Sequence, residues 1–196
     1  RIRPGLWALE EYRSLLADRG IVAQDATNSD SEQVHEFNHS YYQGLLLYIG
    51  NMKKLETYVP AQDKNRRCIN VKLGEISTLT EVPPFSYQEF VNRSSTIDVM
   101  WFQPNSLGSE VMMPDSFFEV EHSTDFQNSL CKFSDLQCFN AQMFIVADAR
   151  RHDEFIAKLS HDYFKPISDR VKFVSYDKLD RYYEGLITQK KSSLIL

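Results

Sequence analysis

The feature that most constrains the fold is the segment FFEVEHST at residues 117–124. As a β-strand it places Glu119 and Glu121 on the same face, because alternate side chains along a strand point the same way. The two carboxylates would lie roughly 7 Å apart, and at an effective dielectric constant of about 20 they would repel by about 2.4 kcal/mol. The segment is too apolar for a surface loop, so a metal ion, a basic partner or a raised pKa must offset that cost.

A second apolar segment, TIDVMWF at residues 96–102, carries one carboxylate near its start, Asp98. Its β-branched and aromatic residues predict a strand. Proline, glycine and small polar residues at positions 104–108 predict a loop between the two strands. If the strands are neighbours, about 4.8 Å apart, Asp98 comes beside Glu119 and Glu121. Three converging carboxylates predict a hard-oxygen site suited to Mg²⁺, whereas the alternative is three unrelated surface acids.

The two segments resemble the PD-(D/E)XK nucleases, the restriction-endonuclease-like superfamily, in the phrases IDVMWF (97–102) and FEVE (118–121). The resemblance covers roughly residues 31–176. In that family an Asp on one strand and a Glu/Asp-x-Lys on the next hold a divalent metal. This chain departs from the pattern because Glu121 stands where Lys is expected, as in the Glu-x-Glu variant of some restriction enzymes. The resemblance implies that Asp98, Glu119 and Glu121 are catalytic and bind Mg²⁺, with Mn²⁺ as a substitute.

Further candidate catalytic residues lie on predicted helices. In some members of the superfamily the catalytic Lys has moved to the helix after the second strand, where this chain has Lys132; the alternative is a surface lysine. Many members carry an acidic residue or a Gln on the helix before the sheet, which Glu36 and Gln43 match. A polar stripe facing solvent is the alternative for both. We interpret His39, on the same stripe, as a satisfied polar residue rather than a ligand.

The whole pattern predicts an α/β fold with a mixed central sheet flanked by helices. Apolar residues at helical spacing predict a first helix up to Met52, opened by a capping box at Ser29-x-x-Glu32. A second capping box, Thr124-x-x-Gln127, precedes a helix that buries Phe126 and two further apolar residues. The other predicted elements are strands at 57–60, 142–147 and 171–174 and helices at 153–163 and 177–187. Their order is helix, three strands, helix, strand, helix, strand, helix, which is similar to the restriction-endonuclease-like core.

We divide the chain into an N-terminal segment, residues 1–28, and a nuclease-like domain, residues 29–196. The phrase RPGLWAL at residues 3–9 resembles the last wing strand of a winged-helix domain. Because the chain starts with Arg1 rather than Met, we expect a DNA-binding N-terminal domain that is absent from this chain. The alternative for the segment is ordinary N-terminal packing.

Charge and composition limit the partners. The net charge of −5 argues mildly against nucleic acid, but catalytic acids contribute to it and basic residues cluster locally at 64–67, 150–151 and 190–191. No apolar run approaches the roughly 20 residues of a membrane span. The three cysteines lack zinc-ligand spacing and are typical of reduced thiols in a cytoplasmic protein.

The sequence therefore predicts a Mg²⁺-dependent endonuclease acting on duplex DNA, most specifically a restriction endonuclease, with a homodimer left open. The alternative is a catalytically inactive nuclease-fold module that binds DNA or regulates a partner. Binding of a divalent ion between Asp98 and Glu119 separates the two.

Overall fold

The structure is a computed structural model that describes residues 32–193. The wing-like phrase at 3–9, Ser29 of the first capping box and the boundary at residue 28 lie outside these residues. Among the helices of residues 32–193, none combines the length and the apolar character needed to cross a membrane.

The core is a five-stranded sheet in the order β1-β4-β5-β6-β7. Its strands are β1 (Glu56–Tyr58), β4 (Val99–Asn105), β5 (Gly108–Glu121), β6 (Gln142–Ala147) and β7 (Val171–Ser175). Strands β1, β4 and β5 pair antiparallel, whereas β5, β6 and β7 run parallel. The mixed sheet and the order of the elements around it confirm the predicted fold class.

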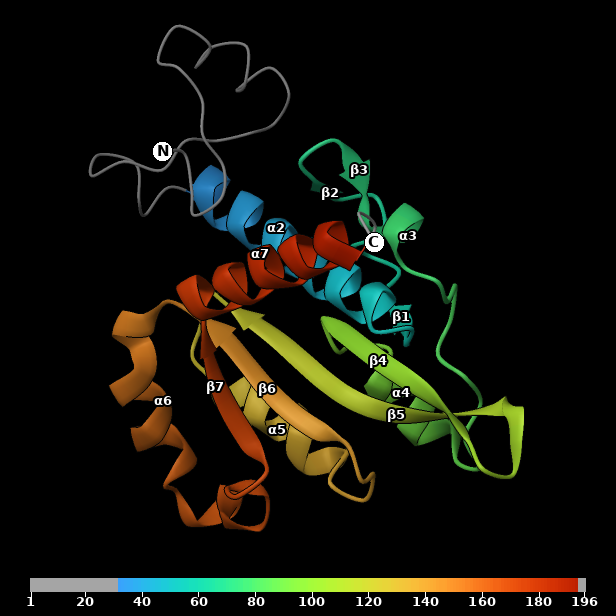
Figure 1. Cartoon of the computed structure of the whole chain (residues 1–196). Coiled ribbons are helices and arrows are strands. Elements are labelled where there is room, and N and C mark those ends of the chain that lie inside the picture. Colours follow the sequence, from blue (N-terminus) through green and yellow to red (C-terminus); the bar gives the residue numbers. More distant parts are fainter. Residues whose placement is uncertain (1–31, 194–196) are drawn as a thin grey trace, which may run out of the picture.

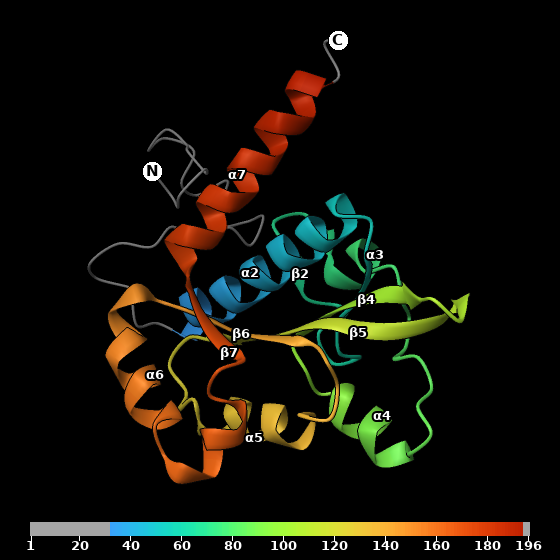
Figure 2. The same cartoon turned by 60° about the horizontal axis from the view of Figure 1, so that its bottom comes forward.

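Helices cover both faces of the sheet (Figure 1, Figure 2). One face carries α2 (Glu32–Met52) and α7 (Tyr176–Ser193), and the other carries α4 (Gln88–Ser94), α5 (Gln127–Asp135) and α6 (His152–Leu159). A two-stranded sheet of β2 (Arg67–Cys68) and β3 (Val71–Lys72), followed by the short α3 (Leu73–Ile76), packs beside α2. The 3-10 turns η2 (Ala149–Arg151) and η3 (Asp162–Ile167) flank α6.

The alternation predicted for β5 is confirmed by the two hydrophobic cores. Phe118 and Val120 pack into the core beneath α2 and α7, whereas Phe117 packs into the core with α5 and α6. Glu119 and Glu121 therefore share the α5 face at the end of the strand where β5, β6 and β7 finish together.

The loop predicted between the two acid-bearing strands is confirmed but is shorter than expected, a turn at residues 106–107. Strands β4 and β5 continue into a hairpin in which Asn105 pairs with Gly108, and the Asn105 side chain accepts from the Leu107 N–H at 3.0 Å. Pro104 and Pro114 lie where this hairpin extends past β1 and β6.

Two helix predictions also need correction. The capping box at Thr124 is wrong, because Thr124 Oγ1 donates to Glu121 while Asp125 Oδ1 accepts from the Gln127 N–H at 2.9 Å. The helix predicted at 153–163 ends at Leu159 and is followed by the 3-10 turn η3, which contains Pro166. Helix α4 was not predicted, because its seven residues are too few to show a helical repeat.

Candidate functional site

A cleft of about 320 Å³ opens where β5 ends. Its lining comes from α2, the loop before β2, the residue preceding β4, the end of β5 with the turn that follows it, and α5. We call this space the cleft. The three acids predicted from the sequence, Asp98, Glu119 and Glu121, all line it.

Asp98 and Glu119 are held against each other by the pairing of β4 with β5. The Asp98 backbone N–H donates to Glu119 Oε1 at 3.4 Å, and the Val120 backbone N–H donates to Asp98 Oδ2 at 2.8 Å. Each carboxylate thus binds the backbone of the other's strand. Both side chains are buried, so the antiparallel register sets their positions.

Glu121 joins the pair through hydroxyl groups that the sequence reasoning missed. Ser129 Oγ lies 3.0 Å from Glu119 Oε2 and also contacts Glu121 Oε1, and Thr124 Oγ1 donates to Glu121 Oε2. Ser129 is fully buried on the apolar face of α5 beside Leu130. A small polar residue on the apolar face of a predicted helix is the feature of the sequence that could have indicated Ser129.

Lys132 is drawn into the cleft rather than lying free on the surface. Its Nζ donates to both Glu119 carboxylate oxygens, at 2.8 and 3.0 Å, and to the Thr96 carbonyl at 2.8 Å. Only 12% of its side chain is exposed. The position matches a lysine supplied from the helix after the acidic strand.

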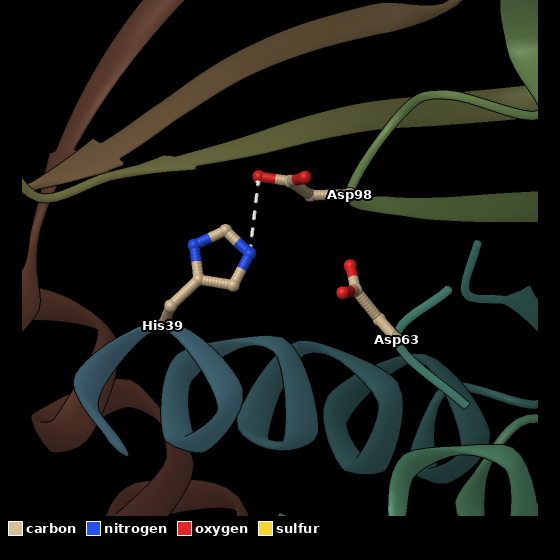
Figure 3. A group of neighbouring side chains, drawn as sticks. All are labelled: His39, Asp63 and Asp98. Carbon is tan, nitrogen blue, oxygen red and sulfur yellow. Dashed lines mark ion pairs between the residues drawn. The ribbon is translucent and has the colours of Figure 1, made fainter. Parts of the chain in front are cut away.

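On the α2 side of Asp98 lie His39 and Asp63 (Figure 3). His39 Nε2 is 3.8 Å from Asp98 Oδ2. The buried Gln43 amide donates to Asp63 Oδ2 at 2.9 Å and to the Asp98 carbonyl at 3.2 Å. Asp63 was missed because it lies in a polar segment that has no periodicity. Glu36 belongs to α2, but its side chain lies outside the described part of the structure.

Burial and mutual repulsion raise the pKa values of two of the acids, Asp98 and Glu119. Desolvation raises the pKa of Asp98 to about 7, although Lys132 and the Val120 N–H oppose the shift. Desolvation and the Asp98 charge raise the pKa of Glu119 to about 8, against the opposing effect of Lys132. Burial lowers the pKa of Lys132, but Glu119 and Asp98 more than offset this, so its pKa is raised and it stays protonated.

The charges of the described residues suit a divalent cation. Four buried carboxylates, Asp63, Asp98, Glu119 and Glu121, face the basic groups of Arg66 and Lys132. When all are ionised, two negative charges remain uncompensated. Carboxylate oxygens are the ligands that Mg²⁺ and Mn²⁺ prefer, so this set of donors can hold such an ion.

Of the basic cluster at residues 64–67, Arg66 lines the cleft and pairs with Asp63 Oδ1 at 3.1 Å. Lys64 donates to the Thr80 carbonyl, and Arg67 donates to the Asn70 carbonyl at 2.7 Å. Arg66 is therefore the member of this cluster that lies in the cleft.

Comparison with known families gives a match over most of this chain. The family model of the Type II restriction enzyme NmeDI C-terminal domain matches residues 21–193. Neither the curated proteins nor the solved structures gave a significant match. The matched residues include every residue that lines the cleft.

Proposed function

The chain belongs to the family of the Type II restriction enzyme NmeDI C-terminal domain, and from this premise we propose that it is a Mg²⁺-dependent endonuclease that hydrolyses phosphodiester bonds of duplex DNA. We assign its site to the Glu-x-Glu variant of the PD-(D/E)XK nucleases. The observation that carries the proposal is the convergence of Asp98, Glu119 and Glu121 with Lys132 in the cleft.

Asp98, Glu119 and Glu121 would hold Mg²⁺, with Mn²⁺ as a substitute. When bound, such an ion supplies a Lewis acid for the phosphate and a water of lowered pKa. The raised pKa values of Asp98 and Glu119 support this assignment, because burial disfavours their charged forms and a bound divalent ion would favour them again.

We assign to Lys132 the role that the strand lysine has in the commoner PD-(D/E)XK pattern, where this chain has Glu121. It stays protonated, so we assign it the stabilisation of negative charge on the phosphate rather than the acceptance of a proton. Glu121 already accepts from the hydroxyls of Thr124 and Ser129. We assign it the acceptance of the proton that the attacking water loses. Arg66 would bind a phosphate at the rim of the cleft.

The proposal is tested by incubating the full chain with duplex DNA and Mg²⁺. We expect cutting that EDTA abolishes, and we expect Asp98→Ala and Glu119→Ala each to reduce it to the level without enzyme. Glu110→Ala is the matched control, because Glu110 is an exposed acid on the same strand as Glu119, outside the cleft. DNA binding without Mg²⁺-dependent cutting would instead favour the inactive binding module.

A further inference from the structure

We propose that the cleft contains a cation seat on the α2 side of Asp98 that includes a nitrogen ligand: His39 Nε2, with Asp63, Asp98 and Gln43 supplying oxygen ligands. The seat shares only Asp98 with the acids assigned above. The seat extends the proposed function, and any role it has in catalysis rests on that function. Because of the imidazole, it selects Mn²⁺ over Mg²⁺.

The spacing between His39 and Asp98 fits two ligands of one ion, and Asp63 lies close to both. One ligand atom from each of His39, Asp63 and Asp98 lies within 4.8 Å of the other two (Figure 3). The 3.8 Å between His39 Nε2 and Asp98 Oδ2 is too long for a hydrogen bond. Two ligands about 2.1 Å from one ion lie between about 3.0 Å apart, at right angles, and about 4.2 Å apart, when opposite. The separation between His39 Nε2 and Asp98 Oδ2 falls inside that range.

Gln43 is a second, independent sign of a ligand. Its side chain is fully buried, and its amide points into the cluster with Nε2 2.9 Å from Asp63 Oδ2. Its other end, Oε1, is buried and has no hydrogen-bond partner among the described residues. A half-turn of the amide would exchange the two ends, giving up the hydrogen bonds of Nε2 to Asp63 and to the Asp98 carbonyl, and would turn Oε1 toward the cluster, where a bound cation would replace those bonds.

The protein's own cations leave this seat open. Lys132 forms an ion pair with Glu119 on the other side of Asp98, and Arg66 forms one with Asp63 Oδ1. The oxygen Asp63 Oδ2 faces the Gln43 amide instead. Within residues 32–193 neither Asp98 Oδ2 nor Asp63 Oδ2 forms an ion pair with a lysine or arginine, so the seat retains carboxylate charge beside an imidazole nitrogen.

The ligand chemistry decides which ion the seat prefers. Mg²⁺ is bound mainly by oxygen, whereas imidazole suits 3d ions, and Mn²⁺ accepts carboxylates as well. A seat of one nitrogen and several oxygens should therefore bind Mn²⁺ more tightly than Mg²⁺, and His39 should account for the difference.

The test is pulsed electron paramagnetic resonance of Mn²⁺ bound to the full chain without DNA. We expect nitrogen modulation from a directly bound imidazole, which His39→Gln removes. His122→Gln is the matched control, because His122 also lines the cleft but its ring nitrogens contact Asn38 at 3.4 Å and Tyr176 at 3.1 Å.

By calorimetry, His39→Gln and Asp63→Asn should each weaken Mn²⁺ binding at least tenfold, while His39→Gln leaves Mg²⁺ binding nearly unchanged. Circular dichroism confirms that each variant folds.

Three results would overturn the seat: bound Mn²⁺ without nitrogen modulation, modulation that survives His39→Gln, or modulation lost in His122→Gln. Any of these leaves the proposed function intact if Mg²⁺-dependent cutting persists. Conversely, nitrogen modulation that depends on His39 in a protein that cuts no DNA supports the seat and rejects the proposed function.

Discussion

At the scale of single residues, the ammonium group beside the acids comes from a helix rather than from the strand. Lys132 reaches in from α5 to bind Glu119 at 2.8 Å, while under the proposed PD-(D/E)XK assignment Glu121 occupies the strand position where a lysine is expected. The charge needed next to the acids is thus retained, although the residue that supplies it has changed place in the sequence.

Replacing Lys132 by Met should show how much depends on this ammonium. The change leaves Glu119 buried without its cation, so we expect a loss of about 3–5 kcal/mol of stability in metal-free protein at a pH where Glu119 is ionised. Cutting should fall by about 10²-fold or more. Lys165→Met, at an exposed lysine of η3, is the control in both urea unfolding and cutting assays. Unchanged cutting by Lys132→Met would remove the lysine from the mechanism.

Glu121→Lys restores the commoner family pattern on the strand, yet we expect it to be inactive. The new side chain would be protonated near neutral pH, because the pKa of lysine is about 10.4, and it would meet Lys132 within the same cleft. Glu121→Gln should also lose cutting while keeping its contacts with the hydroxyls. Substantial cutting by Glu121→Lys, measured as single-turnover rates, would show that Glu121 only holds metal or orients water.

At the scale of elements, α2 and β2 must pack closely for the two sides of the cleft to meet. Gly44 of α2 faces Cys68 of β2, and a Cβ at Gly44 would lie 2.3 Å from the Cys68 Cβ. This contact helps to fix the β2 end of the loop that carries Asp63 and Arg66 against α2, which carries His39. Glycine at position 44 is therefore a packing requirement of the site.

Gly44→Ala should destabilise the protein by about 1–3 kcal/mol because it overpacks this contact. Gly185→Ala in α7 is the matched control, since a Cβ there meets no atom within 4 Å, and it should be neutral or stabilising by up to about 1 kcal/mol. Equal unfolding free energies for the two glycine variants would contradict the packing argument.

At the scale of the whole molecule, the buried acids make stability depend on pH and metal together. The pKa values of Asp98 and Glu119 in the folded protein, about 7 and about 8, lie above those of the unfolded chain. Their contribution is therefore fully present below about pH 4 and is lost as pH rises through about 7 to 8. Metal binding has the opposite trend, because it requires the deprotonated acids.

We therefore expect Mg²⁺ to raise the melting temperature more at pH 8.5 than at pH 6. Scanning calorimetry with Mg²⁺ or with EDTA at the two pH values measures the difference. The double variant Asp98→Asn with Glu119→Gln should abolish both the Mg²⁺ effect and this part of the pH dependence. A Mg²⁺ effect that is equal at both pH values would show that these carboxyl groups do not hold the ion.

The sequence by itself determined the sheet and one side of the cleft. The alternation in β5 places Glu119 and Glu121 on one face, and the apolar run of β4 places Asp98 beside them, because both follow from local periodicity and the pairing of neighbouring strands. Local patterns overestimated the length of the loop between β4 and β5, which strand pairing shortens, and failed at the start of α5, where a side-chain hydrogen bond overrode the expected cap.

Only the tertiary structure decided the other side of the cleft. His39, Asp63 and Ser129 come from a helix, a loop and a second helix, and no spacing in the sequence relates them to Asp98. Their approach depends on how α2 and α5 pack on opposite faces of the sheet, and the direction of Lys132 depends on Glu119 lying within its reach. Contacts between distant segments arise from packing, which local periodicity does not encode.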